Sequence, residues 1–333
     1  SETDDQPAFD RTASFSVNFP LGAFGRAGAP VQPERVLFQG ATIWTCGPEG
    51  VLQNASLLVG QGKILAVGTD LDVPADVRTV DARGKHITPG IIDCHSHMAS
   101  DGGINESGQA ITAEVRIGDF VDSRDIAIYH QLAGGVTCAS ILHGSANPIG
   151  GQNQVIKLRW GAAGEGLKFS LAPKGIKFAL GENVKQSNWG EKFTTRYPQT
   201  RMGVDQIIRD AFHSAQQYRL RWRQWEDTRR GLPPRKDLEL DAIAEILEGK
   251  RWIHCHAYRQ DEMLALLRTL EEYEVTIGTL QHVLEGYKIA DVMARHGAMG
   301  SAFSDWWAYK FEVYDAIPYN GALMYQAGVC VSF

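Results

Sequence analysis

Histidine recurs in a spacing that suits metal binding. Two apolar runs each end in a pair of histidines separated by one residue, His95 with His97 and His254 with His256. Side chains alternate along a β-strand, so both members of such a pair point the same way. A third apolar run ends in His282. Because the chain holds only 10 His, this recurrence favours a metal centre over a set of hydrogen-bonded core residues.

Short apolar runs that alternate with helical patterns surround these histidines. Alternation of strands and helices is typical of a parallel sheet, and eight strand candidates predict an α/β fold of the (β/α)8 TIM-barrel class. The active site of that barrel forms at the C-terminal ends of its strands, where the histidines fall. The strand candidates are 91–97, 136–142, 155–160, 175–181, 252–256, 276–282, 298–303 and 329–333, and the helix candidates are 204–229, 238–248, 261–272 and 287–296.

The chain of 333 residues divides into three predicted regions. Residues 1–34 are rich in Gly, Pro and Ala without clear periodicity, which predicts an extended arm. Residues 35–88 hold short β-type runs separated by turns, which predict a small β-sandwich formed with strands that flank the barrel. Residues 89–333 remain for the barrel, close to the roughly 250 residues such a domain usually takes.

Composition and charge argue against several classes of protein. The net charge of −6 offers no basic surface for nucleic acid or for an anionic membrane. The basic, aromatic stretch 218–225 has acidic neighbours, which is typical of a solvated helix with a buried tryptophan face. The apolar stretches are shorter than the ~18–20 residues of a membrane helix. The 5 Cys are scattered without a CxxC pair, which predicts reduced thiols.

The run 87–97, Ile-Thr-Pro-Gly-Ile-Ile-Asp-Cys-His-Ser-His, resembles the first barrel strand of the amidohydrolase superfamily. The segment 133–138 resembles its second strand, and the strand ends at His256 and His282 extend the similarity. The resemblance covers about residues 35–333 and is nearest to the imidazolonepropionase-like branch. It implies a metal-dependent hydrolase built on a TIM barrel with a β-sandwich.

The resemblance also implies a ligand set. His95 and His97 would bind the first metal, with His256 and His282 at the ends of strands five and six. One or two divalent ions are implied, and Zn is the commonest choice for hydrolysis among the metals that imidazole and carboxylate ligands accept.

In binuclear members a group on strand four, a Glu or a carboxylated Lys, bridges two metals. Two candidates compete for this role, Glu182 at the strand end and Lys177 within the strand. They face opposite sides of a regular strand, and Lys177 points inward only if Ile176, Phe178 and Leu180 face the helices. We favour Glu182 because a carboxylate binds metal without modification, and a plain surface Glu is the alternative.

The superfamily's general base is an Asp at the end of strand eight, and the sequence ends at Phe333 before that position. The catalytic base is therefore unknown on this chain. We expect it on a further polypeptide, which is a cleaved fragment, a continuation or a second subunit that completes the barrel. Asp305 after strand seven is a weaker substitute. The chain begins with Ser, which fits either a removed leader or a shortened chain, so cytoplasmic and periplasmic or secreted locations stay open.

Other residues near the predicted strand ends are candidates for substrate contacts. His143 would either orient a substrate carbonyl or cap its own loop, and the glycine-rich run 149–153 lets backbone approach a ligand. His254 lies one pair deeper than His256, which suits a supporting role. Residues that suit either a substrate pocket or simple packing are Asn147, Tyr258, Arg259, Trp306, Trp307 and Tyr309.

These expectations combine into one function, the hydrolysis of a C–N bond in an amide, peptide, lactam or cyclic amide by metal-activated water. A metal-dependent deaminase of a ring amine shares the histidine pattern, and a non-catalytic interaction module shares the fold. The expected partners are a small-molecule or peptide-like substrate and the completing C-terminal fragment or second chain. A homo-oligomer is compatible with the sequence, whereas nucleic acid and a membrane span are not expected.

Overall fold

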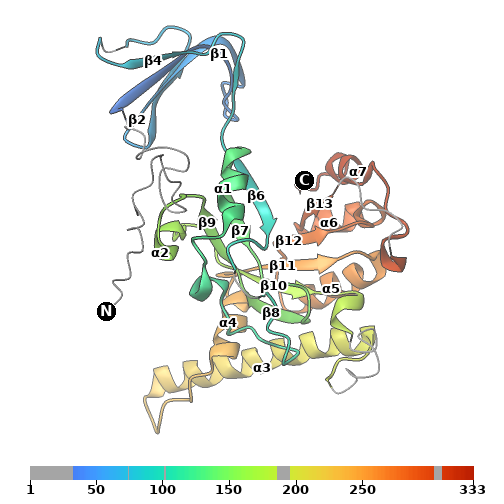
Figure 1. Cartoon of the computed structure of the whole chain (residues 1–333). Helices are drawn as coiled ribbons and strands as arrows, with labels where there is room; N and C mark the ends of the chain where they lie inside the picture. Colours follow the sequence, from blue (N-terminus) through green and yellow to red (C-terminus); the bar gives the residue numbers. More distant parts are fainter. Residues whose placement is uncertain (1–32, 74, 101–102, 186–195, 304–309) are drawn as a thin grey trace, which may run out of the picture. The chain divides into compact units, whose positions relative to one another are not determined.

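The computed structural model describes residues 33–73, 75–100, 103–185, 196–303 and 310–333 (Figure 1). The chain divides into two compact units, Ser1–Ile91 and Ile92–Phe333. The predicted arm over 1–34 lies outside the described residues as far as residue 32. Asp305, Trp306, Trp307 and Tyr309 lie outside them as well.

The first unit holds a five-stranded sheet. Its strand order is β3-β2-β1-β4, and β5 also pairs with β1. Strands β4 and β5 run parallel to β1, whereas β2 is antiparallel to both β1 and β3. Its described strands form this one sheet, so a two-sheet sandwich stays a prediction. The strands are β1 (Arg35–Trp44), β2 (Val51–Gly60), β3 (Lys63–Gly68), β4 (Arg78–Asp81) and β5 (His86–Ile87).

The second unit mixes helices and largely parallel strands, which confirms the predicted α/β class. One sheet has the order β14-β13-β12-β11-β10-β8, and a second has the order β6-β7-β9. Strands β10 to β14 run parallel to one another in that row. The strands are β6 (Ile91–Ser96), β7 (Val136–Ile141), β8 (Ile149–Gln152), β9 (Gln154–Lys157), β10 (Gly175–Ala179), β11 (Trp252–Ala257), β12 (Thr279–His282), β13 (Met299–Ala302) and β14 (Val331–Ser332).

The third predicted strand, 155–160, is not a parallel barrel strand. Strand β9 pairs antiparallel with β7, and β8 pairs antiparallel with β10. Only residues 142–148 connect β7 to β8, and a parallel return needs a crossover of roughly a dozen residues or more. The chain therefore turns back on itself. Because Asn153 alone separates β8 from β9, this extended segment joins the two sheets edge to edge.

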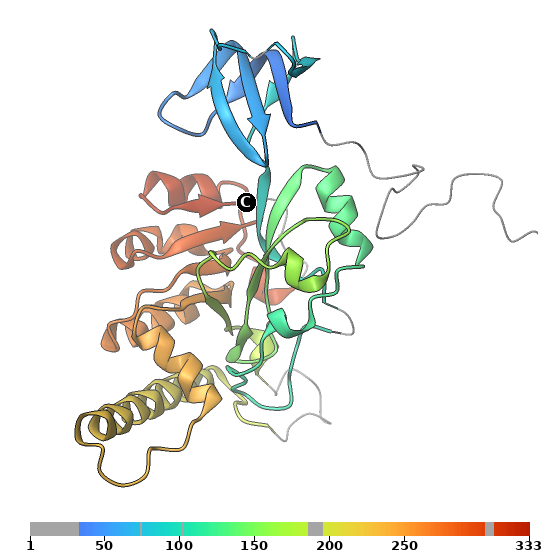
Figure 2. The ribbon, with the colours of Figure 1, turned by 90° about the vertical axis from the view of Figure 1, so that its left-hand side faces the viewer.

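Helices α3 to α7 lie in sequence between the parallel strands β10 to β14 and gather on one side of their sheet (Figure 2). The four helix predictions are confirmed, with ends shifted by a few residues. None of the helices in the described ranges is both long and apolar enough to cross a membrane. The α-helices are α1 (Ile126–Ala133), α2 (Gly164–Leu167), α3 (Arg201–Thr228), α4 (Leu238–Leu247), α5 (Gln260–Glu272), α6 (Ala290–His296) and α7 (Asn320–Gln326). Short 3₁₀ helices are η1 (Ile117–Phe120), η2 (Glu182–Val184), η5 (Gly286–Lys288) and η6 (Phe311–Val313).

The main core lies between strand β10 and the helices that cover it. Ile176, Phe178 and Leu180 belong to one buried apolar cluster with residues of α3, α4 and α5. The Phe178 ring lies 6.3 Å from the ring of Phe212 on α3, centre to centre. Side chains alternate along a strand, so the residue between Ile176 and Phe178 points to the opposite side, away from the helices. This packing fixes the orientation of β10.

We expect Phe178→Ala to lower the free energy of unfolding by about 3–5 kcal/mol, because it removes a fully buried ring and leaves a cavity under α3. Urea denaturation followed by circular dichroism measures the change. Phe120→Ala is the matched control, since this ring is 81% exposed and its loss should change stability by less than about 0.5 kcal/mol. Equal destabilisation by the two substitutions would contradict this account of the core.

Candidate functional site

The structure gathers His95, His97, His256 and His282 at the C-terminal ends of β6, β11 and β12. The ring of His95 lies 5.2 Å from that of His97 and 4.7 Å from that of His282, centre to centre. The ring of His256 also lies 4.7 Å from that of His282. The parallel register that pairs His256 with Gln281 and Ala257 with His282 brings the last two histidines together. The spacing predicted from sequence therefore becomes one cluster in space.

Lys177 enters this cluster from β10. Its side chain is buried, and its Nζ lies 3.5 Å from Nε2 of His95. The same Nζ donates a hydrogen bond of 2.6 Å to Oε1 of Gln281, next to His282. Lys177 reaches the histidines because Ile176 and Phe178 pack toward the helices on the other side of β10.

Glu182 lies beyond the end of β10, where it begins η2. It is half-buried, and its backbone N–H donates to Oε2 of Glu312 at 2.9 Å. Of the two candidate bridges, Lys177 contacts His95 through its amine, and Glu182 contacts Glu312 through its backbone. Which residue bridges metals stays a prediction.

Burial keeps the histidines of the cluster uncharged. Desolvation lowers the pKa of His95, His97, His256 and His282, and the nearby Lys177 lowers each further. Burial also lowers the pKa of Lys177 to about 7, so a large share of its amine is neutral near neutral pH. Neutral imidazole is the form that binds metal.

Ring nitrogens in the cluster have the lone pairs that a metal needs. In the part of the chain that the structure describes, the buried atoms His95 Nδ1 and His256 Nε2 have no hydrogen-bond partner. His97 Nδ1 lies 2.9 Å from the carbonyl of Leu142, so this nitrogen donates and leaves Nε2 as the acceptor. Among the described residues, no three His, Cys, Asp or Glu side chains already form a complete metal-binding group. The donors are close together and of a suitable type, but they do not converge on one point.

The backbone is strained where β12 ends. His282 and Val283 have φ values of 66° and 36°, in the left-handed region that non-glycine residues seldom adopt. Asn320 Nδ2 donates to the carbonyl of Val283 at 2.9 Å, and the N–H of Gly286 donates to the same oxygen at 2.8 Å. Strain of this kind persists where the surroundings hold it, and it is common at functional sites.

His143 uses both ring nitrogens on the backbone. Its Nδ1 lies 2.9 Å from the carbonyl of Gly144, and its Nε2 accepts the N–H of Glu106 at 2.8 Å. A Cβ at Gly150 would lie 2.7 Å from the ring, so a glycine is needed there. These contacts favour the loop-capping role over orientation of a substrate carbonyl. His143 also lines a pocket of about 500 Å³ formed largely by the segment between β6 and α1.

The other residues singled out from sequence have structural partners. His254 lies deeper in the sheet, with Nδ1 3.1 Å from Oγ1 of Thr279, and burial lowers its pKa to about 4. Asn147 donates to the carbonyls of residues 106 and 109 at 2.7 Å each. Arg259 pairs with Asp261 at 3.0 Å. Among these residues, in so far as the structure describes them, Tyr258 lies against the cluster, with its ring 4.5 Å from that of His256 and 5.3 Å from that of His282.

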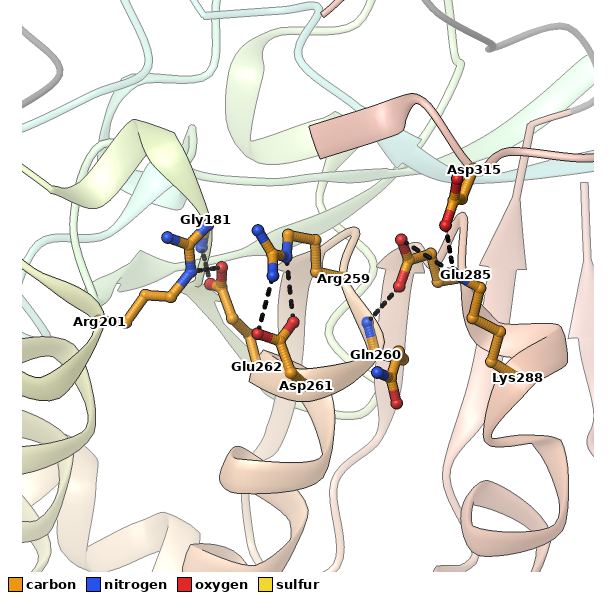
Figure 3. Close-up of polar contacts among 9 residues, drawn as sticks. All are labelled: Gly181, Arg201, Arg259, Gln260, Asp261, Glu262, Glu285, Lys288 and Asp315. Atoms are coloured by element: carbon orange, nitrogen blue, oxygen red, sulfur yellow. Dashed lines mark hydrogen bonds and ion pairs between the residues drawn. The ribbon is translucent and has the colours of Figure 1, made fainter. Parts of the chain in front are cut away.

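Ion pairs and hydrogen bonds tie together the loops that follow β10, β11 and β12 (Figure 3). The carboxylate of Glu262 accepts the N–H of Gly181 at 2.6 Å and pairs with Arg201. The carboxylate of Glu285 accepts the N–H of Gln260 at 2.9 Å, at the start of α5, and lies 3.4 Å from Lys288. These contacts fix the strand ends that carry the cluster.

Sequence reasoning missed Gln281, Glu312 and Lys310. Gln281 accepts the hydrogen bond from Lys177, and its position beside His282 was the available signal. Glu312 has a fully buried side chain, which pairs with Lys310 at 2.7 Å. The ammonium group of Lys310 lies over the ring of Tyr258, 4.5 Å from its centre. Lys310 and Glu312 lie between the last two predicted strands, 298–303 and 329–333, and no motif marks them.

Comparison with known proteins gives three informative similarities, although no protein-family model matches the chain. The crystal structure of an amidohydrolase from Thermotoga maritima MSB8 matches with a TM-score of 0.80 and 31% identity, over 89% of this chain and 77% of that one. The amidohydrolase tasK of Hapsidospora irregularis is 31% identical over 82% of this chain. An imidazolonepropionase of Klebsiella pneumoniae (strain 342) is 39% identical over 74 residues, 21% of this chain.

The chain spans 31% of the length of the Hapsidospora protein and 18% of the imidazolonepropionase. The Thermotoga structure, in contrast, is matched over most of its length at an identity that indicates common descent. The chain therefore belongs to the amidohydrolase superfamily of hydrolases.

Proposed function

We propose that this chain carries the metal site of a hydrolase that cleaves C–N bonds in small amides, peptides or cyclic amides. The observation that supports this most is the meeting of four neutral imidazoles and the buried Lys177 amine at the C-terminal ends of three parallel strands and β6. So many buried polar nitrogens would destabilise a region that served packing alone, because burying each of them costs free energy.

We propose further that the strands of the second unit close into a distorted (β/α)8 barrel, in which the antiparallel segment of β8 and β9 takes the place of the third parallel strand. The joining of β9 and β8 gives a continuous row from β6 through β7 to β10 and on to β14. Side chains from the two ends of this row meet, since Cys94 Sγ on β6 lies 3.3 Å from Ser332 Oγ on β14. It also lies 3.4 Å from Ser301 Oγ on β13. These contacts support closure between β14 and β6.

The chemical type of the donors suits a divalent metal. His95 and His256 offer buried nitrogens that have no hydrogen-bond partner within the described part of the chain, and His97 is oriented by the carbonyl of Leu142. With His282 they form the set of ligands that we propose, and zinc suits imidazole donors. A metal bound there supplies polarisation of the substrate carbonyl and a water of lowered pKa. The protein supplies a partly enclosed site and holds the rings in place.

We assign the bridging role to Lys177 in a binuclear centre. Its amine would add to carbon dioxide, forming an N–C bond and releasing one proton, so that a carbamate replaces the amine and offers two oxygens. The site favours this product, because Lys177 Nζ lies beside His95 and Gln281 rather than beside a carboxylate. Glu182 would then hold the neighbouring loop through its backbone contact with Glu312.

We expect the protein purified without chelator to contain zinc or another divalent metal. His256→Asn and His282→Asn should each weaken zinc binding at least about tenfold, because each removes a donor from the set. Metal content by mass spectrometry and zinc titration against a chelating dye measure the effect. His213→Asn, on the exposed face of α3, is the control and should bind metal like the parent protein. A parent protein with no bound metal would overturn the proposal.

We expect Lys177→Met to lose metal, whereas Glu182→Gln should keep it. Methionine is unbranched and only one atom shorter than lysine, and it cannot form a carbamate, so the bridge is lost while most of the packing remains. ¹³C nuclear magnetic resonance after incubation with labelled bicarbonate should show a carbamate carbon in the parent protein and in Glu182→Gln, but not in Lys177→Met. The reverse pattern of metal loss would assign the bridge to Glu182.

A further inference from the structure

Lys310 places a positive charge beside the histidine cluster. Its Nζ lies 4.5 Å from the centre of the Tyr258 ring, which is a cation–π contact. The Tyr258 ring lies 4.5 Å from the ring of His256. The Lys310 Nζ therefore lies no farther from the centre of the His256 ring than the sum of these two distances. A small substrate can span that separation.

Glu312 holds Lys310 in this position. The side chain of Glu312 is fully buried, and its Oε1 lies 2.7 Å from the Lys310 Nζ. Its other oxygen accepts the N–H of Glu182 at the end of β10. A Cβ at Gly181 would lie only 2.7 Å from that oxygen, so a glycine there lets the carboxylate approach the backbone. One buried carboxylate thus links the loop after β13 to the loop after β10.

The surroundings of Lys310 suit the recognition of an anion. Its side chain is 23% exposed, so a small ligand can reach it. Glu312 accepts the N–H of Glu182 in addition to pairing with Lys310, and an ammonium group carries three N–H donors, so a second carboxylate can share it.

We propose that Lys310 binds a carboxylate of the substrate next to the scissile C–N bond. The substrate class is then N-acyl amino acids and short peptides with a free C-terminal carboxylate. This inference rests on the proposed function, because it places the scissile bond at the histidine cluster. Lys310 is a specificity-determining residue in this scheme, and Glu312 is the positioning residue that orients it.

The test compares acids with their neutral amides. The zinc-loaded protein is titrated with a panel of N-acetyl amino acids and with the matching carboxamides, and hydrolysis of the same compounds is followed in parallel. We expect the parent protein to bind the acids more tightly. Lys310→Met should raise the Kd for the acids roughly 10- to 100-fold and leave the Kd for the amides within about twofold, because only the acids lose a charged hydrogen bond. Lys310→Arg should recover much of the preference.

Lys174→Met is the matched control. Lys174 is also ion-paired, to Glu245 at 2.8 Å, but it precedes the start of β10 rather than following its end. Its removal should change neither Kd. Three results would overturn the inference. The parent protein binds acids and amides equally, or it binds neither, or Lys310→Met loses affinity for both to the same extent. If the protein hydrolyses acids and amides equally well, this inference alone is refuted. If it prefers to bind acids but contains no metal and hydrolyses nothing, the proposed function is refuted and the anion site remains.

Discussion

The burial of the Lys177 amine among uncharged imidazoles is the constraint on which this site depends. A buried amine loses its hydration. The hydrogen bond to Gln281 replaces part of it, and the lowered pKa of Lys177 lets the amine lose its charge, which makes burial less costly. The arrangement requires that β10 keep its packing against α3, since a slip of one residue would turn the lysine into the helices. It also requires the β11–β12 register, which places Gln281 beside the amine. One face of β10 therefore packs the core, and the opposite face presents Lys177 to the site.

The loops beyond the strand ends convert a row of strands into a defined site. Carboxylates do most of this work, because Glu262, Glu285 and Glu312 each accept a backbone N–H from a neighbouring loop or helix start. Each also pairs with a cation, so the buried negative charge is compensated. The result is a rim in which the position of one loop depends on the next. Rigid support of this kind is what a site needs in order to hold its donors at fixed distances.

Local patterns predicted the elements well and the contacts between distant elements poorly. The period of two in the histidine pairs and the helical periodicity of 204–229 depend only on neighbouring residues, and both led to the observed β-strands and to α3. The parallel third strand was wrong because the connection 142–148 is too short for a crossover, a length that a strand count ignores. The orientation of Lys177 was undecidable from sequence, since both faces of β10 are buried. Gln281 and Glu312 act across 104 and 130 residues of sequence, and no local pattern reports such contacts.

The left-handed backbone at His282 limits what evolution can place there. With φ at 66°, β-branched and bulky residues are disfavoured, and the types that tolerate this region are mainly Gly, Asn, Asp and His. Of these four, only His offers a neutral ring nitrogen that reaches the other imidazoles. The backbone at the end of β12 therefore restricts which amino acids can occupy position 282, whether or not catalysis is under selection. In a related protein that has lost this histidine, we expect glycine or a short polar residue at the same position, because the backbone conformation there persists after the catalytic function is lost.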